Sequence, residues 1–437
     1  MIEEKIIVGL DIGTTKVCVL VGKKNAYNQL EVLGMGKAVS SGVVRGMVIN
    51  IDKTVMAIEK AVKKAEDNSQ IDINIVNVGI AGRYIESSIH RGSITREVVD
   101  EEITVDDVAK LTSDMYRMVT PPGSEIIHAI PQHYVVDYEE GIKDPVGMSG
   151  VKLEADFHIV IAKTSAVNNV YKCIQRAGLE VDNFILEPLA SSLSVLSEEE
   201  KEAGVCLVDI GGGTVDIAIF HDSMIRHTAV IPFGGNVITA DIKHGCLVME
   251  HQAERLKTKF GKAITEEIST NELITIPGLR GRPSKEIAVQ NLTYIIEARM
   301  EEIIELIRTE IIISGLQGNL AAGIVVTGGG AQLQYLKQLF EYVTGLDTRM
   351  GYPNEYLGKS KGNGVKSPMY ATGVGLMLAG FKALDYREEY YKTAGNTASI
   401  TAKRDNKNEK KSSNFFRKLL HKTKGLLMDD YYQGKES

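Results

Sequence analysis

The chain has 437 residues, of which 43% are hydrophobic and 24% charged, which is ordinary for a globular protein with a large core. No apolar run reaches the ~20 residues that span a bilayer, and we expect no secretory signal. The net charge of −7 is uneven, because residues 403–437 are basic and the rest is acidic. This excludes a nucleic-acid-binding body and predicts an anionic partner for the tail only. Four scattered cysteines predict a reducing compartment without disulfides: Cys18, Cys173, Cys206 and Cys246.

The first notable feature is a glycine turn between two apolar strands near the N-terminus. Strand-like residues lead to Asp11, and Val17–Val21 supply the returning strand. The turn reads Asp-Ile-Gly-Thr-Thr-Lys over residues 11–16. Backbone N–H groups, hydroxyls and a lysine at one turn are suited to a phosphate group, and the aspartate is suited to a nearby metal.

Residues 52–164 are predicted to complete one α/β unit and to begin a second, smaller one. Asp52 is the expected N-cap of a helix that ends near Asp67. Residues 82–164 are interpreted as an α+β insertion or, alternatively, as a loop-rich decoration. The expected elements are a strand at 74–81, a helix at 104–119, and strands at 125–137 and 151–162.

The next segment returns to helix and strand. A helix is predicted over 165–177, with Gly178 as its C-terminal cap. Residues 184–186 form a strand that runs into a helix at Pro188, so Glu187 lies at the junction. Two interpretations of this glutamate remain open: a carboxylate that faces a cleft, or a first-turn residue that favours the helix dipole.

A second glycine turn repeats the pattern of the first about half the chain length later. The run Val208-Asp209-Ile210-Gly211-Gly212-Gly213-Thr214-Val215-Asp216 predicts a hairpin whose turn is nearly all backbone. A plain hairpin is the alternative for this motif taken alone. Two phosphate hairpins, one in each half, suggest a duplicated α/β domain that holds one nucleotide between its halves.

The second half continues with helices and a third glycine turn. A long helical region is expected to reach Phe260, and Glu254 and Lys257 share one of its faces. This pair is either a nucleoside contact or a solvated salt bridge. A long helix is predicted over 286–313, and Gly328–Gly330 follow a buried strand.

The three turns, in this order, resemble those of the actin-like ATPase superfamily, and within it the sequence is similar to the FtsA family of bacterial cell-division proteins. The similarity covers roughly residues 5–385. It implies an α/β, duplicated actin-like (ribonuclease H-like) fold with an inserted small α+β subdomain and a flexible C-terminal tail that ends in an amphipathic helix. The implied division of the chain is 1–81 with 165–204 as the first half, 82–164 as the insert, 205–233 with 312–385 as the second half, and 234–311 as the upper lobe of that half.

The resemblance also implies ATP and Mg²⁺ as ligands. The implied nucleotide-binding residues are Asp11, Gly13, Thr14, Thr15, Lys16, Gly211, Gly212, Gly213, Thr214, Gly234, Gly235, Glu254, Lys257, Gly328, Gly329, Gly330 and Gly373. Asp11 and Asp209 are expected near the metal, mainly through water. Glu187 or Asp209 would position water for any hydrolysis, which we expect to be slow at most. Simple close helix packing is the alternative role for Gly373.

The family further implies protein partners for this chain. The upper lobe would receive the acidic C-terminal peptide of the tubulin-like protein FtsZ, with Arg280, Arg282 and Arg299 as candidate complementary charges. The insert is implicated in self-association into a polymer and in contacts with other division proteins.

The tail has its own signal. Residues 386–412 are polar and predict a flexible linker, and residues 413–428 form an amphipathic pattern. One face carries Phe415, Phe416, Leu419, Leu420, Leu426 and Leu427, and the other is basic, with Arg417, Lys418 and Lys422. This pattern is typical of a helix that lies on anionic membrane lipid. Docking into a protein groove is the alternative.

The sequence therefore predicts an ATP-binding, polymerising cell-division adaptor that anchors FtsZ at the cytoplasmic face of the inner membrane, at the division site. Two alternatives remain open. One is a pilus-assembly actin-like adaptor, which should lack the basic amphipathic tail. The other is a sugar or acid kinase of the same superfamily, which needs an acceptor pocket and an aspartate base near the cleft.

Overall fold

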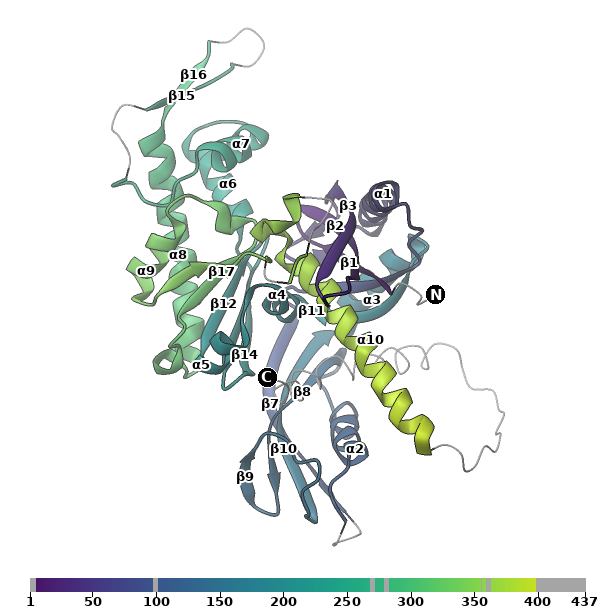
Figure 1. Ribbon diagram of the computed structural model, residues 1–437. Coiled ribbons are helices and arrows are strands. Elements are labelled where there is room, and N and C mark those ends of the chain that lie inside the picture. The colour runs from purple at the N-terminus through teal and green to yellow at the C-terminus, as the bar shows by residue number, and fades with distance from the viewer. Residues whose placement is uncertain are drawn as a thin grey trace.

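The computed structural model describes residues 5–96, 101–267, 272–278, 283–354, 356–358 and 363–397 (Figure 1). Two similar halves lie side by side, the insert projects from one end, and the lobe with β15 and β16 projects from the other. Among the described helices, none is long and apolar enough to cross a bilayer.

The first half is built on a five-stranded sheet in the order β11-β6-β1-β2-β3. Its strands are β1 (Ile6–Ile12), β2 (Lys16–Lys24), β3 (Leu30–Val39), β6 (Ile75–Ile80) and β11 (Glu180–Leu186). β2 is antiparallel to β1 and β3, whereas β6 is parallel to β1 and β11. Helices α1 (Ile51–Ser69) and α3 (Thr164–Arg176) share a buried core with this sheet. The N-cap of α1 is Asn50, whose side chain accepts from the Lys53 N–H at 3.0 Å, so the prediction of Asp52 was wrong by two residues because Asp52 already lies in the first turn.

The second half repeats this sheet strand for strand, in the order β14-β13-β12-β17-β18. Its strands are β12 (Val205–Ile210), β13 (Val215–His221), β14 (Met224–Ile231), β17 (Ile324–Thr327) and β18 (Thr348–Met350). β12, β13 and β14 pair antiparallel in sequence order, as β1, β2 and β3 do in the first half. β17 is parallel to β12 and β18, as β6 is parallel to β1 and β11. The predicted duplication is therefore confirmed.

The insert is a four-stranded antiparallel sheet, in the order β7-β10-β8-β9, with one helix packed on it. Its elements are β7 (Ile85–Thr95), α2 (Val105–Met115), β8 (Ser124–Val136), β9 (Glu139–Ile142) and β10 (Lys152–Lys163). Phe157 and Leu153 of β10 are fully buried with Leu111 of α2. A separate core of this kind confirms an α+β subdomain and excludes a loop-rich decoration.

The upper lobe differs from the sequence prediction in two places. The expected continuous helical region is two helices, α6 (Gly235–Gly245) and α7 (Glu250–Phe260), because Leu247 adopts a left-handed conformation with φ +46° between them. The long helix α8 (Val289–Ile313) begins later than predicted, because residues 285–288 pair as β16 (Lys285–Ala288) with β15 (Leu273–Ile276).

The last helix, α10 (Ala371–Thr397), belongs to the first half by its packing. Its Val374, Met377 and Phe381 are buried against Leu20 of β2, so assigning 312–385 to the second half places this boundary too late. α10 also runs into the predicted flexible linker 386–412 and ends at Thr397, and Arg387 in this stretch binds Asp182 of β11 at 3.1 Å. Figure 1 shows α10 running from the centre of the molecule past β1 and β11.

The remaining elements are short. They are β4 (Val43–Val44), β5 (Met47–Val48), α4 (Glu187–Val195), α5 (Glu198–Ala203), α9 (Leu336–Thr344), and the 3-10 turns η1 (Gln317–Asn319), η2 (Gly330–Gln332), η3 (Asn363–Lys366) and η4 (Pro368–Tyr370).

Candidate functional site

The two predicted glycine hairpins have the same turn geometry. The Gly13 N–H donates to the Lys16 carbonyl at 3.0 Å, and the Gly211 N–H donates to the Thr214 carbonyl at 2.9 Å. The turns also meet tip to tip. A Cβ added to Gly212 would lie 2.7 Å from Thr15 Oγ1, and one added to Gly213 would lie 2.5 Å from Thr14 Oγ1. Each half therefore presents a backbone cradle to the same space.

Four carboxylates gather behind these turns. Asp11 and Asp209 end equivalent strands, Glu187 opens α4, and Asp216 lies opposite Asp209 on β13. Burial, followed by the charges of Asp11, Asp216 and Asp209, raises the pKa of Glu187 well above its usual range. Because the charges of Asp11, Asp209 and Asp216 all act on Glu187, the four side chains lie close to one another in the folded chain.

Lys16 is the cation of this acidic group. Its Nζ lies 3.1 Å from Asp11 Oδ2, and its side chain is largely buried. Burial acts to lower the lysine pKa, but Asp11 and more distant acids outweigh it and raise the pKa above its usual value. Lys16 therefore stays charged at any physiological pH and offsets part of the negative charge near the turns.

Asp209 is held by two hydroxyls that the sequence reasoning did not identify. Ser191 Oγ of α4 donates to Asp209 Oδ2 at 2.7 Å, and Thr372 Oγ1 of α10 donates to the same atom at 3.2 Å. Burial raises the pKa of Asp209 in spite of these hydrogen bonds. No local motif marks Ser191 or Thr372, because they lie on helices that meet only in the folded molecule.

Asp216 was also missed, although the sequence carried a signal for it. The register pairs Asp209 with Asp216, where the first half pairs Asp11 with Cys18, and the other residues of β13 up to Phe220 are apolar. A fully buried carboxylate in such a strand needs an explanation. Thr214 Oγ1 donates to Asp216 Oδ2 at 3.0 Å, while Oδ1 is buried without a hydrogen-bond partner among the described residues.

Asp216 predicts a pH dependence of stability. Burial, and then the charge of Asp209, raises its pKa from 3.8 to about 7, so the folded state binds a proton that the unfolded state releases. The resulting stabilisation is fully present below the unfolded pKa and falls as the pH rises through about 7. Asp216→Asn should flatten this slope and be more stable than wild type at pH 8, by at most ~4 kcal/mol. Thermal unfolding from pH 5 to 8.5, without nucleotide or divalent cation, measures this.

The control for this prediction is Asp106→Asn on the exposed first turn of α2, which should leave the slope as it is. An unchanged slope in Asp216→Asn would mean that Asp216 is ionised in the folded protein at all these pH values.

The lobe is fastened directly to the second turn. The N–H groups of Gly235 and Asn236, at the start of α6, donate to the carbonyls of Gly211 and Gly212 at 2.9 and 2.8 Å. Gly234 packs so closely that an added Cβ would lie 2.7 Å from the Gly211 carbonyl oxygen. The predicted Gly234 and Gly235 therefore lie at the site.

The predicted pair Glu254 and Lys257 also lies at this end of α6. Lys257 Nζ lies 2.7 Å from Glu254 Oε2 and donates to the Gly235 carbonyl at 2.8 Å and to Thr239 Oγ1 at 2.7 Å. The lysine is mostly buried, and burial lowers its pKa. The pair is therefore part of a partly buried network that joins α7 to α6, in which Lys257 is mostly buried and the Glu254 side chain is 44% exposed.

The third glycine turn faces the second. Gly328 has φ +90°, and a Cβ there would overlap Asp209 Oδ1, whereas a Cβ on Gly329 would meet nothing within 4 Å. Gly330 packs on Ile210. Gly373 packs on Leu20, so helix packing accounts for it, and its neighbour Thr372 is the residue that reaches Asp209.

The insert reaches the same site through one histidine. The N–H of Leu186, the residue before Glu187, donates to His128 Nε2 of β8 at 3.1 Å. Burial, and then the nearby His158, lowers the pKa of His128 to about 3, so this ring is neutral and can accept the hydrogen bond. The position of Glu187 is therefore fixed partly by the insert.

The predicted partner residue Arg299 lies on α8, within the upper lobe. Arg299 pairs with Asp241, 2.5 Å from its Nε, and with Glu302, so its charge is already balanced within the lobe. Arg280, Arg282 and the tail residues 413–428 lie outside the described residues. In the part of the chain that the structure describes, no three acidic, histidine or cysteine side chains are arranged to bind a metal ion directly.

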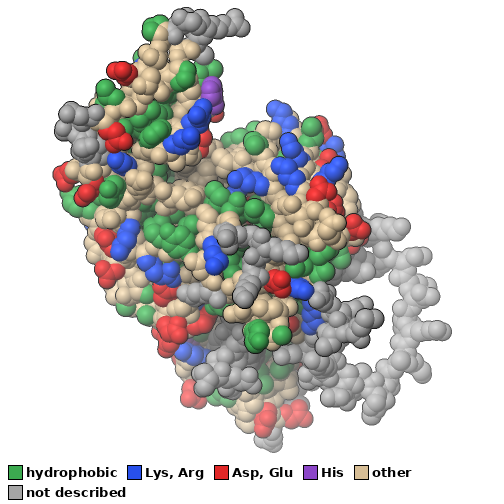
Figure 2. All heavy atoms as spheres, turned by 45° about the horizontal axis from the view of Figure 1, so that its top comes forward, with side chains coloured by type: hydrophobic (Ala, Val, Ile, Leu, Met, Phe, Trp, Pro, Cys, Tyr) green, Lys and Arg blue, Asp and Glu red, His purple; other side chains and the backbone are tan. Residues whose placement is uncertain are grey.

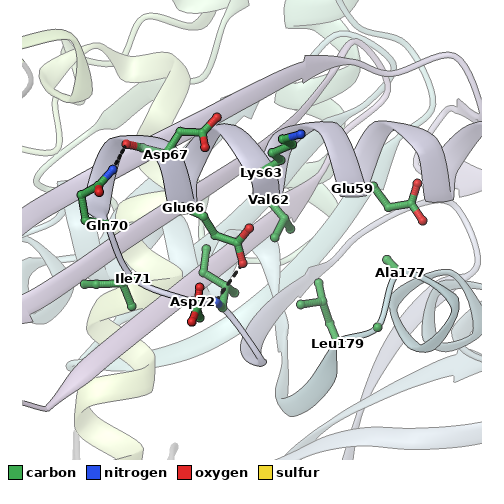
Figure 3. Close-up of a pocket in the computed structure, with 12 residues that line it drawn as sticks. Glu59, Val62, Lys63, Glu66, Asp67, Gln70, Ile71, Asp72, Ala177 and Leu179 are labelled. Carbon is green, nitrogen blue, oxygen red and sulfur yellow. Dashed lines mark hydrogen bonds between the residues drawn. The ribbon is translucent and has the colours of Figure 1, made fainter.

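The described surface has a hollow between the upper lobe and the first half (Figure 2) and a second groove that lies away from the glycine turns. Figure 2 shows the surface hollowed between the upper lobe and the first half, with basic side chains on both rims. A separate groove of about 560 Å³ lies between the end of α1 and the α3–β11 connection, and it is lined by Glu59, Lys63, Glu66 and Asp72 among others (Figure 3). That groove is at the amino ends of β6 and β11, the opposite edge of the sheet from Glu187, and it is not part of this site.

Comparison with known proteins agrees with this architecture. The family model described as cell division protein FtsA matches residues 206–375, and the one described as the SHS2 domain inserted in FtsA matches residues 82–161. The chain is 41% identical over 378 residues to cell division protein FtsA of Pseudomonas aeruginosa, which covers 86% of this chain and 90% of that protein.

This chain belongs to the FtsA family. Cell division protein FtsA of Escherichia coli is 36% identical over 385 residues, covering 86% of this chain and 91% of the relative. That of Borreliella burgdorferi is 36% identical over 418 residues, covering 95% and 99%. The protein is accordingly a cell-division protein of the actin-like superfamily, as the resemblance implied.

Solved structures confirm the predicted actin-like fold. A PilM–PilN type IV pilus biogenesis complex has a chain that aligns with a TM-score of 0.63 at 15% identity, covering 86% of this chain and 98% of that one. MreB5 of Spiroplasma citri bound to ADP aligns with a TM-score of 0.51 at 16% identity, covering 90% and 99%. At these identities the likeness concerns the fold alone.

Proposed function

We propose that this FtsA-family protein binds ATP with Mg²⁺ between its two halves, polymerises, and links the FtsZ ring to the cytoplasmic membrane at the division site. The observation that carries the nucleotide part is the pair of matched turns, with the same internal hydrogen bond, that meet tip to tip in front of four carboxylates. Backbone cradles of this kind suit phosphate groups. The fold is shared with MreB5, which was solved with ADP.

The site residues fit ATP with Mg²⁺. Gly13, Thr14, Thr15 and Lys16 would face phosphate from the first half, and Gly211 to Thr214 from the second. Asp11 and Asp209 would hold the metal mainly through its water ligands. Lys257 and Glu254, together with the open face of Gly329, would hold the nucleoside.

Any hydrolysis would depend on water positioned by Glu187 or Asp209. The Glu187 carboxylate lies among three others and has a raised pKa, so at neutral pH it holds its proton more firmly than a free glutamate does. A bound divalent cation would favour the ionised form of these acids and so restore a base that can orient water. We therefore propose tight nucleotide binding with at most slow turnover.

Calorimetric titration of the full chain with ATP in Mg²⁺ tests the nucleotide proposal. We expect saturable binding with one nucleotide per chain. Absence of binding at millimolar ATP would overturn this part of the function.

The membrane and partner proposals rest on the sequence of the tail and the lobe. The basic amphipathic segment 413–428 would lie on anionic lipid, and polymerisation would add avidity to a helix that binds modestly alone. Because Arg299 is paired with Asp241 and Glu302, an acidic FtsZ peptide would have to displace one of these carboxylates or use Arg280 and Arg282 instead.

Truncation of the tail should abolish membrane binding. We expect the full chain to co-sediment with vesicles that contain anionic lipid, and the 1–405 chain to remain in the supernatant. Added salt should weaken binding of the full chain, because part of the attraction is electrostatic. Equal sedimentation of both chains would contradict the tail as the anchor.

The two alternatives are separated by other assays. The structural likeness to a pilus-biogenesis complex supports the pilus adaptor only at the level of fold, whereas the cell-division relatives are 36–41% identical. A phosphoryl-transfer screen with sugars and short acids tests the kinase alternative.

A further inference from the structure

The hairpin formed by β4 and β5 has a strained tip. Val43 pairs with Val48 and Val44 with Met47, which leaves Arg45 and Gly46 as the two turn residues. Their φ values are +49° and +73°. Two positive φ values define the turn type that favours Asn-Gly and disfavours long side chains at the first position. An arginine here breaks a local rule, and such conflicts concentrate at functional sites.

The strained tip is fastened to the first glycine turn. The Gly46 N–H donates to Thr14 Oγ1 at 3.2 Å. A Cβ on Gly46 would lie 2.8 Å from the Cα of Gly82, where the chain enters the insert. The main chain of Arg45 is therefore fixed beside a residue that the proposed function places on phosphate.

The side chain of Arg45 crosses to the other half. Its guanidinium carbon lies 5.8 Å from the centre of the Phe233 ring. Phe233 directly precedes Gly234, whose backbone packs on Gly211 and Thr214 of the second glycine turn. Arg45 is thus next to both glycine turns: its hairpin is hydrogen-bonded to the first turn, and its side chain contacts Phe233, which precedes the residue packed on the second turn.

The positive charge of Arg45 has no ion-pair partner within the described part of the chain. Within that part Arg45 contacts the Phe233 ring, and none of the described carboxylates lies within ion-pair distance of it. A planar guanidinium that is held by an aromatic face keeps its N–H groups available, and these suit the oxygens of a phosphate.

We propose that Arg45 contacts the terminal phosphate of bound ATP and thereby distinguishes ATP from ADP. This inference rests on the proposed nucleotide site. The backbone N–H groups of the two turns would hold the inner phosphates, and Arg45, which approaches from a separate hairpin, would meet the outermost one. Because its side chain reaches Phe233, the same contact would favour the closed arrangement of the halves when ATP is bound.

The test is Arg45→Asn in the full chain, with calorimetric affinities for ATP and ADP in Mg²⁺. Asparagine suits this turn, so the variant should unfold at the same temperature as wild type or higher. Its affinity for ATP should fall at least about tenfold, the effect of one lost charge-assisted hydrogen bond, and its affinity for ADP should stay within about twofold. Arg45→Lys keeps the positive charge but loses the planar guanidinium group, so this variant should retain part of the preference for ATP over ADP.

The control is Lys53→Ala, which removes an exposed cation from the first turn of α1 in the same half and should change neither affinity. Unchanged ATP affinity in Arg45→Asn, or an equal loss for ATP and ADP, overturns the inference while leaving the proposed function in place. If wild type binds neither nucleotide, the proposed function fails and the inference fails with it.

Discussion

Gly375→Ala should lower the free energy of unfolding by about 3 kcal/mol, although alanine normally stabilises a helix relative to glycine by ~1 kcal/mol. The reason is the crossing of α10 over α4. A Cβ on Gly375 would overlap the main-chain carbonyl of Ala190, which cannot rotate away as a side chain could. The helices must then separate, and they carry Thr372 and Ser191, the two hydroxyls that hold Asp209. Chemical denaturation measures the stability, and ATP titration should show weakened binding.

The control for this crossing is Gly318→Ala. Gly318 lies in the short turn η1, where an added Cβ meets nothing within 4 Å, so its unfolding midpoint should stay close to wild type. A Gly375→Ala protein as stable as wild type would mean that α10 and α4 can move apart at no cost. The close crossing would then have no role in placing Asp209.

Gly328→Ala should impair both the fold and the nucleotide site. Gly328 has φ +90°, a conformation that costs an alanine ~1–2 kcal/mol, and its Cβ would overlap Asp209 Oδ1 and approach the Ile210 backbone. We expect a loss of stability of about 2–4 kcal/mol and a decrease in ATP affinity of more than about tenfold, because Asp209 must move from Ser191 and Thr372. Thermal unfolding and ATP titration test the two effects separately.

The neighbouring glycine provides the matched stability control. Gly329 has φ −66° and open space at its Cβ position, so Gly329→Ala should keep the wild-type unfolding temperature. Its ATP affinity is informative in itself, since a loss there without a loss of stability would indicate that the open face meets the nucleotide. If Gly328→Ala and Gly329→Ala behave alike in unfolding, the close approach to Asp209 is not a constraint.

The sequence allowed the local pieces of the site to be predicted because each is encoded within a few neighbouring residues. The two Asp-Ile-Gly turns, the third glycine turn and the strand-to-helix junction at Glu187 each combine a strand pattern with residues that a tight turn requires. The residues that were missed are encoded elsewhere. Asp216 depends on hairpin register, and Ser191 and Thr372 depend on the crossing of two helices that are far apart in the sequence.

The errors in the element boundaries have a similar origin. Leu247 breaks the predicted long helix because the chain reverses between α6 and α7, and Gly245 at the end of α6 was the local signal for this break. The polar composition after residue 385 indicated a linker, yet α10 continues to Thr397, and Arg387 in this stretch forms an ion pair with Asp182 of β11. The polar composition of a segment shows that it can be exposed to water, but it does not show whether one of its side chains pairs with a residue far away in the sequence.

By itself, the sequence determined the duplicated hairpins and the resemblance to the FtsA family, because these depend on local periodicity and on turn residues with special backbone demands. Only the tertiary structure decided that four carboxylates share one buried environment, that α10 belongs to the first half, that His128 of the insert supports the junction at Glu187, and that Arg45 reaches Phe233 across the halves. Each of these features depends on which distant segments contact one another in the folded chain. Burial and neighbouring charges can change a residue's pKa only once those segments are in contact.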